Sequence, residues 1–304
     1  MVQLIDVVPV KNILGEGVLW NVRTARLWWT DIQGKCLFCY DPAMRTIDRI
    51  WTPERVGSFA FVAGSRKLIA AFESGLAFFD PDTRSVEWLF RLERPPSPVV
   101  RFNDGRTDRQ GRFWAGTMVE GDGPPLGRLH CLDRTGHVAV QPDPVHISNA
   151  LCVSPDGTRL YFADSPQRKI FVYDLDPVSG ALSNRRIFAE TPEGAYPDGA
   201  NVDRDGFVWN AQWGSSRVVR YAPDGSVDLV VEVPASQPSC VAFGGADLNL
   251  LFVTTARDGL KGDALLRQPS AGNLFVYKTD TKGLPEAEFI FDGGKQKSAG
   301  ASAG

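Results

Sequence analysis

Short apolar stretches alternate with turn residues along almost the whole chain. The repeating unit is an apolar stretch, a turn rich in Gly or Asp, and a second stretch rich in aromatic residues. Six copies can be aligned, at residues 22–32, 62–74, 107–118, 153–165, 202–213 and 244–256. Runs of four to eight β-branched and aromatic residues between turn signals indicate strands, and no long helical period competes with them.

The copies recur at a steady spacing. One aromatic or aliphatic residue in the second stretch marks each copy: Trp29, Ile69, Trp114, Phe162, Trp209 and Phe252. Successive markers are 40, 45, 48, 47 and 43 residues apart. A period in this range with several strands per unit is typical of a β-propeller. We therefore predict an all-β fold, a six-bladed β-propeller that forms a single domain over residues 1–292.

Three segments fall outside the repeat. The apolar run near the N-terminus, within residues 1–9, is predicted to add a strand to the last blade and so close the ring, which leaves few free sheet edges. Residues 256–272 form a long insert in the last unit, predicted to be a loop or a short helix. Residues 293–304 are small and polar, and we expect a flexible C-terminal tail there.

Charge and cysteine content narrow the class of protein. The chain has 33 Lys and Arg against 36 Asp and Glu, so its formal net charge is −3. This balance argues against a nucleic-acid or membrane-surface partner, and no apolar run reaches the ~20 residues of a membrane span. Five cysteines and an N-terminus unlike a signal peptide favour a reducing, cytoplasmic location. The oligomeric state stays open between a monomer and a weak homo-oligomer.

The candidate site follows from the repeat. Equivalent positions of successive blades converge at one end of a propeller channel, and the residues just before the expected innermost strands are Glu16, Ser58, Asn103, Asn149, Asp198 and Ser239. Four of the six carry a carboxylate or a carboxamide, the ligands that suit a hard divalent cation such as Ca²⁺, Mg²⁺ or Mn²⁺. The alternative is that Asp and Asn here only shape turns. The shared blade position favours the site, because ordinary turn residues need not recur in phase.

Several motifs resemble one known family. They are LGEGVLW (14–20), RFNDGRTD (101–108), GRFWAGTM (111–118), ISNALCVSPDG (148–157), YPDGANVD (196–203), ARDGL (256–260) and LLRQPSAG (265–272). Together they resemble the SMP-30/gluconolactonase/regucalcin family of sugar lactonases, and most of all its bacterial pentonolactonases of the L-arabinonolactonase and xylonolactonase type. The resemblance implies a six-bladed propeller with one divalent metal ion in its channel.

The resemblance also implies roles for six residues. Metal ligands fall on Glu16, Asn149 and Asp198, and substrate contacts fall on Arg101 and Asn103. A further acidic substrate contact is expected shortly after the G-T-M motif, where this chain has Glu120. Some members carry two acids at this place, whereas here the next residue is a glycine, so recognition of the sugar hydroxyls on this side is expected to differ.

The expected reaction is metal-dependent hydrolysis of a sugar lactone to the aldonic acid, which makes the protein a carboxylic ester hydrolase of carbohydrate metabolism. A divalent ion would stabilise the charge that develops on the carbonyl oxygen, and Asp198 would take a proton from the attacking water or orient it. Ca²⁺ is the first expectation, with Mn²⁺, Mg²⁺, Zn²⁺ and Fe²⁺ as alternatives. Alternative functions are a gluconolactonase, an organophosphate or ester hydrolase on the same metal, and a calcium-binding propeller without catalysis. The pair of Arg101 and Asn103 favours a lactonase over the last of these, because a pure ion site needs no contacts to a polyol.

Overall fold

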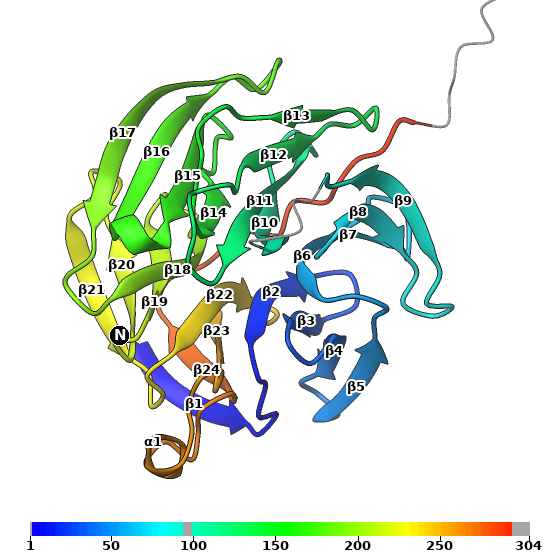
Figure 1. Ribbon diagram of the computed structural model, residues 1–304. Helices are drawn as coiled ribbons and strands as arrows, with labels where there is room; N and C mark the ends of the chain where they lie inside the picture. The colour runs from blue at the N-terminus through cyan, green and yellow to red at the C-terminus, as the bar shows by residue number, and fades with distance from the viewer. Residues whose placement is uncertain (1, 94–98, 294–304) are drawn as a thin grey trace, which may run out of the picture.

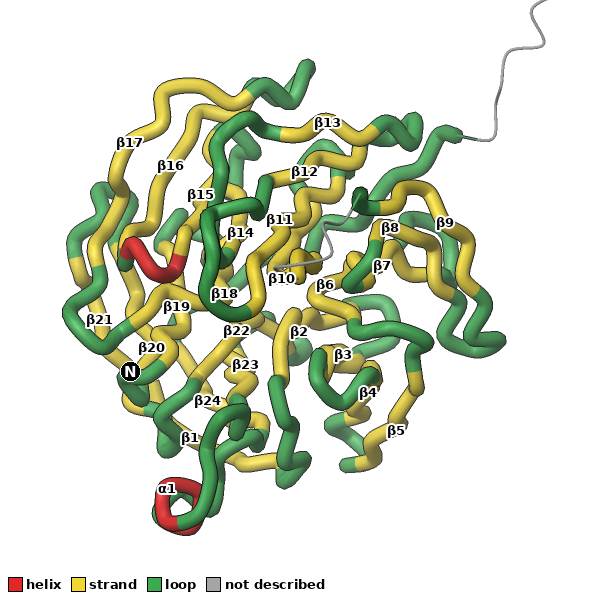
Figure 2. Tube along the Cα trace, viewed as in Figure 1, coloured by secondary structure: helices red, strands yellow, loops and turns green. Residues whose placement is uncertain are grey.

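Six antiparallel sheets of four strands each are arranged in a ring around a central channel (Figure 1). The computed structural model describes residues 2–93 and 99–293. Strands and connecting loops make up almost all of this part of the chain, and the short helical segments Ser165–Gln167 and Asp263–Leu266 lie in connections between strands (Figure 2). The predicted six-bladed β-propeller is therefore confirmed. Within the same residues, no helix is long and apolar enough to cross a bilayer.

The first three blades follow the order of the sequence, from the innermost strand to the outermost. The first blade contains β2 (Gly15–Asn21), β3 (Arg26–Asp31), β4 (Cys36–Asp41) and β5 (Thr46–Trp51). The second contains β6 (Val56–Phe61), β7 (Leu68–Phe72), β8 (Gly75–Phe79) and β9 (Val86–Arg91). The third contains β10 (Val99–Thr107), β11 (Phe113–Glu120), β12 (Leu129–Leu132) and β13 (Val138–Val140).

The other three blades complete the ring. The fourth contains β14 (Ser148–Val153), β15 (Arg159–Asp164), β16 (Lys169–Leu175) and β17 (Leu182–Glu190). The fifth contains β18 (Tyr196–Val202), β19 (Val208–Trp213), β20 (Arg217–Tyr221) and β21 (Val227–Glu232). The sixth contains β22 (Pro238–Gly244), β23 (Leu250–Thr255), β24 (Leu274–Thr279) and, as its outermost strand, β1 (Val2–Val8).

The sixth blade joins the two ends of the chain. β1 pairs with β24 in antiparallel fashion, with Val2 opposite Thr279 and Val8 opposite Leu274. This confirms that the N-terminal apolar run closes the ring. The insert before β24 contains one short helix, α1 (Asp263–Leu266), as expected for residues 256–272.

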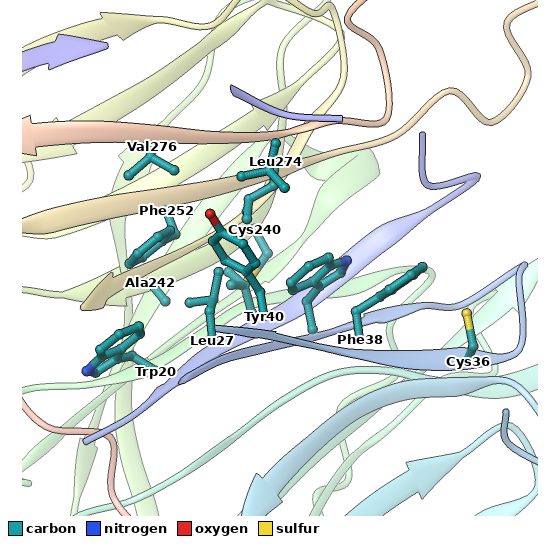
Figure 3. Packing of buried hydrophobic residues seen from close by; sticks show 13 residues of the cluster. Trp20, Leu27, Cys36, Phe38, Tyr40, Cys240, Ala242, Phe252, Leu274 and Val276 are labelled. Carbon is teal, nitrogen blue, oxygen red and sulfur yellow. The ribbon is translucent and has the colours of Figure 1, made fainter. Parts of the chain in front are cut away.

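Apolar side chains fill the space between neighbouring blades. Figure 3 shows residues of the first blade packed against residues of the sixth. Trp20 stacks on Phe252 across this boundary with ring centroids 5.7 Å apart, and Trp29 stacks on Phe38 within the first blade at 5.0 Å. Aromatic side chains bury a large apolar area, which explains why they mark each copy of the repeat.

Two of the repeated turns are held by a tryptophan of the strand that follows them. Asp108 accepts a hydrogen bond from the indole nitrogen of Trp114 at 2.9 Å, and Asp203 accepts the equivalent bond from Trp209 at 3.0 Å. Both aspartates also accept backbone N–H groups of their turns. The aspartate and the tryptophan six residues later therefore fix the turn and the following strand together, since buried polar groups need partners.

A β-bulge interrupts each innermost strand near the same end of the channel. The register shifts lie between Glu16 and Leu19, Val56 and Ser58, Phe102 and Gly105, Asn149 and Cys152, Pro197 and Ala200, and Pro238 and Cys240. A bulge leaves a residue unpaired and re-aims its side chain. The left-handed backbone of Gly17 (φ 57°) and Ala150 (φ 56°) follows directly after Glu16 and Asn149. Asn103 and Asp198 are unpaired residues of their bulges, whereas Glu16 and Asn149 are the last paired residues before theirs.

A C-terminal segment passes under the propeller after β24 (orange to red in Figure 1). The backbone N–H of Phe289 donates to Phe61 O at 2.8 Å, and that of Ile290 donates to Gly111 O at 3.0 Å. The repeat did not predict this path, because the segment belongs to no blade. From residue 294 on, the predicted tail of residues 293–304 lies outside the described residues.

Candidate active site

One cavity of about 470 Å³ opens at the end of the channel where the bulges lie. Its lining includes all six residues singled out in the sequence: Glu16, Arg101, Asn103, Glu120, Asn149 and Asp198. They come from five strands, β2, β10, β11, β14 and β18, which belong to four different blades. The structure therefore brings these side chains together, while their individual roles remain predictions.

Glu16 and Asp198 form the most unusual electrostatic feature of the cavity. Both carboxyl groups are buried, and they are close enough to interact as a hydrogen-bonded pair. Burial raises the pKa of Glu16 well above its usual range, and the negative charge of Asp198 raises it further. Burial and the charge of Asp104 raise the pKa of Asp198 in the same way. Two such groups cannot both ionise at low cost unless a positive charge lies between them.

Hydrogen bonds fix the orientation of Asn149. Its amide Nδ2 donates to Ser165 Oγ at 2.8 Å, and Ser165 Oγ in turn donates to Pro197 O at 2.7 Å. Its Oδ1 accepts a hydrogen bond from Asn103 Nδ2 at 3.1 Å. A carboxamide oxygen has two lone pairs, so Asn149 Oδ1 retains one for another partner.

The donor set of Glu16, Asn149 and Asp198 fits a hard divalent cation. It offers two carboxylates and one carboxamide oxygen, and oxygen donors of this kind suit Ca²⁺ and Mg²⁺. Within residues 2–93 and 99–293, no three His, Cys, Asp or Glu side chains gather as a metal site. A site here would thus depend on the carboxamide of Asn149 and on ligands from outside the protein.

The two serines at the matching blade positions do not line the cavity. Ser58 and Ser239 are fully buried in the channel wall. Ser239 Oγ bonds the carbonyl of Gly15 and lies 3.0 Å from Thr254 Oγ1. Only the longer side chains at the bulges therefore reach the cavity.

Arg101 is held almost completely inside the cavity wall. Its Nε donates to Glu120 Oε1 at 2.8 Å, and its Nη1 donates to Phe102 O at 2.9 Å and to Asn103 Oδ1 at 2.8 Å. Burial lowers the pKa of Arg101, but its reference value is so high that the guanidinium stays charged. Asn103 also donates to Ser148 O at 3.0 Å, so the guanidinium and the carboxamide are fixed relative to each other.

Glu120 faces the cavity as one member of an ion-pair network. Besides the bond from Arg101, it accepts bonds from Arg55 Nη1 at 2.7 Å and Nη2 at 2.9 Å. Burial acts to raise the pKa of Glu120, but the hydrogen bonds from the two arginines outweigh it, so the net shift is downward. Glu120 is therefore ionised at neutral pH and already carries two partners from the protein.

Sequence reasoning missed several residues of this region. Asp104 is buried beside the site, where burial raises its pKa to about 6, and its position next to Asn103 on an innermost strand was an available signal. Arg55 lies just before the innermost strand of the second blade, three residues from the matching position Ser58, and no repeat signal marks it. Gln33 lines the cavity from the turn between β3 and β4, where no repeat signal marks it.

Comparisons with known proteins agree with this geometry. A family model described as the SMP-30/gluconolactonase/LRE-like region matches residues 14–257. L-arabinolactonase of Azospirillum brasilense is 42% identical over 284 residues, which cover 92% of this chain and 93% of that protein. Pentonolactonase XacC of Haloferax volcanii is 35% identical over 289 residues, which cover 92% and 96%.

A solved structure shows the same architecture. The calcium-binding protein regucalcin from Agrobacterium tumefaciens superposes with a TM-score of 0.89 at 30% sequence identity, covering 95% of this chain and 98% of that one. The family match covers most of the repeat, and it includes Glu16, Asn149 and Asp198. On these grounds the chain belongs to the SMP-30/gluconolactonase/LRE-like family.

Proposed function

We propose that this protein hydrolyses the lactone of a five-carbon aldonic acid, L-arabinono- or xylonolactone, to the free acid with the help of one divalent metal ion. The enzyme is a lactonase, a carboxylic ester hydrolase. The observation that carries the proposal is the meeting of Glu16, Asn149 and Asp198 at the same cavity as Arg101 and Asn103. The names of the arabinolactonase and pentonolactonase relatives support a five-carbon substrate.

The metal would be held by Glu16, Asn149 and Asp198. The choice of Ca²⁺ rests on the oxygen-only donor set and on the calcium-binding relative. When bound, the ion supplies a positive charge that polarises the ester carbonyl and offsets the negative charge built up on its oxygen. Its positive charge also relieves the repulsion between the two buried carboxylates.

Side chains at the cavity carry out the other steps of the reaction. Asp198 accepts the proton of the attacking water, or orients that water, because it is a buried carboxylate at the cavity that, unlike Glu120, has no arginine bonded to it. Arg101 donates to a ring or hydroxyl oxygen of the sugar, and Asn103 is placed to share a hydroxyl with it. Leu14, Ile147 and Trp213 form an apolar part of the cavity lining, which limits the water that reaches the ester.

A lactone panel with and without metal tests the proposal. Initial rates on L-arabinono-1,4-lactone, D-xylono-1,4-lactone and D-glucono-1,5-lactone are compared for protein as purified, treated with EDTA, and reloaded with Ca²⁺, Mn²⁺, Mg²⁺ or Zn²⁺. We expect the pentonolactones to give the highest kcat/KM, and EDTA to abolish turnover until a metal is returned. Unchanged rates in EDTA would refute the metal, and a preference for the gluconolactone would refute the five-carbon substrate. Calcium binding without any turnover would leave the non-catalytic propeller as the function.

A further inference from the structure

Four side chains of alternating charge form a chain along one wall of the cavity. They are Glu73, Arg55, Glu120 and Arg101, in the order in which they bond to one another. Two carboxylates and two guanidinium groups make the cluster neutral. Only Glu120 and Arg101 line the cavity, whereas Arg55 and Glu73 lie behind them.

Arg55 is the centre of this cluster. It precedes β6 and is about as buried as the residues around it, with 16% of its side chain exposed. Its Nη1 and Nη2 bind the two oxygens of Glu120 at 2.7 and 2.9 Å, and its Nε donates to Glu73. A two-pronged contact of this kind fixes the orientation of a carboxylate as well as its position.

The fixed carboxylate in turn controls Arg101. Glu120 Oε1 accepts from both Arg55 Nη1 and Arg101 Nε, so one oxygen joins the two guanidinium groups. Arg101 Nη1 is already used by Phe102 O and Asn103 Oδ1. Among the described residues, Nη2 of Arg101 has no hydrogen-bond partner, which leaves it as the donor available to a ligand in the cavity.

We propose that Arg55 is a positioning residue for substrate binding, which acts through Glu120 to hold Arg101 in the orientation that presents Nη2 to the sugar. Arg55 itself does not touch the substrate. The inference rests on the proposed function only in that the ligand bound by Arg101 is a sugar lactone.

A purely structural role for Arg55 is the alternative, and the chain offers a matched control. Arg220 is 15% exposed and pairs with two acids, Asp203 and Asp228, both at 2.9 Å. This second cluster lies on the fifth blade, and none of its members lines the cavity. Loss of either arginine removes two ion pairs, and the loss of Arg220 also leaves the fully buried Asp203 without that partner. Only loss of Arg55 is expected to alter the cavity.

The experiment compares Arg55→Met with Arg220→Met by steady-state kinetics on L-arabinono-1,4-lactone and by melting temperature. We expect Arg55→Met to raise KM about tenfold with kcat within about twofold, since uniform binding is lost rather than transition-state contacts. Arg220→Met should lower the melting temperature without changing KM. An unchanged KM in folded Arg55→Met would overturn the inference.

A double variant separates action through Glu120 from an independent effect. If Arg55 acts through Glu120, the KM of Arg55→Met/Glu120→Gln equals that of the more damaged single variant. Multiplication of the two single effects would contradict the proposal. If Arg55→Met does not fold, Glu73→Gln replaces it, because this change keeps Arg55 and loosens only its Nε; we then expect KM to rise about threefold, and an unchanged KM counts against the inference.

Crystal structures of the wild type and Arg55→Met provide a test that needs no turnover. We expect Glu120 to leave Arg101 Nε and the Arg101 side chain to change rotamer in the variant. If both side chains keep their places, the inference is wrong whatever the activity. If the wild type hydrolyses no lactone, the proposed function fails, but this structural comparison still decides the role of Arg55.

Discussion

The two ends of the central channel use the same strands in opposite ways. β10 supplies Arg101 and Asn103 to the open end and Arg106 to the other end. At the open end two buried carboxylates face each other beside a cavity of about 470 Å³. At the closed end Arg106 is paired with Glu286 of the C-terminal segment, and the remaining space is about 10 Å³.

The difference between the ends lies in charge balance. Arg106 Nη1 contacts both oxygens of Glu286 at 3.0 and 3.1 Å, and Asn201 donates to the same carboxylate at 2.9 Å. The charge of Arg106 is thus paired within the protein, whereas Glu16 and Asp198 need a positive charge from outside. The like-charged pair of Glu16 and Asp198 therefore lies at the end of the channel that holds the cavity. The oppositely charged pair of Arg106 and Glu286 lies at the end that the C-terminal segment covers.

The largest effect is expected at the open end. Asp198→Asn should lower kcat by about 10³-fold, because proton transfer to a positioned carboxylate contributes on this scale. KM on the pentonolactone should change much less. Steady-state kinetics at saturating metal measure both quantities, and a KM change without loss of kcat would remove Asp198 from the chemistry.

A substitution at the closed end should lower stability rather than activity. Glu286→Gln leaves the guanidinium of Arg106 buried without its counter-charge, and we expect the free energy of unfolding to fall by about 3 kcal/mol. Denaturant titration measures this loss, while kcat/KM of the folded variant should match the wild type. A loss of activity without a loss of stability would reverse the assignment of the two ends.

Asp104, which lies on β10 between Asn103 and Arg106, should make the free energy of unfolding depend on pH. Burial raises the pKa of Asp104 to about 6, whereas the unfolded chain titrates near 4. Between these two pH values the folded protein holds one more proton than the unfolded chain. The contribution of Asp104 to the free energy of unfolding is therefore fully present below about pH 4 and is lost as the pH rises to about 6. The free energy of unfolding of the wild type should fall by up to about 3 kcal/mol relative to Asp104→Asn across this window. Urea titrations at pH 4, 5, 6 and 7 follow the difference, and a constant difference would contradict the shift.

The smallest effect is expected for substrate contact at the open end. Arg101→Met should raise KM about tenfold, because a charged hydrogen-bond donor is lost, and should leave kcat within about threefold. Lys67→Met, which removes an exposed ion pair with Glu87, is the control and should behave as wild type. Unaltered kinetics of Arg101→Met would place the substrate elsewhere in the cavity.

The open end was more predictable from the sequence than the closed end. Glu16, Asn103, Asn149 and Asp198 lie within one residue of the same blade position, and a ring fold carries residues at similar phase to the same end of its channel. The N-terminal strand was predictable for the same reason, since a closed ring leaves no free edge. The period of the sequence repeat therefore predicted both the fold and the end of the channel at which the cavity lies.

Interactions between segments of unequal phase were not predictable. Glu286 belongs to no repeat, so nothing in the spacing paired it with Arg106. The bond between Arg55 and Glu120 depends on how far a long side chain reaches from one blade to the next, which a linear pattern does not encode. The bulges were also hidden, because the innermost strands are buried on both faces and so have no apolar–polar alternation that an extra residue could interrupt.

The pairing of β1 with β24 sets a condition on synthesis. Val2 is made long before its partner Thr279. During translation β1 has no partner until β24 has been made. The entropic cost of bringing such distant segments together slows the closure of the ring. The ring can be completed only after Thr279 has been made, so until then the last blade of the nascent chain lacks one of its pairings.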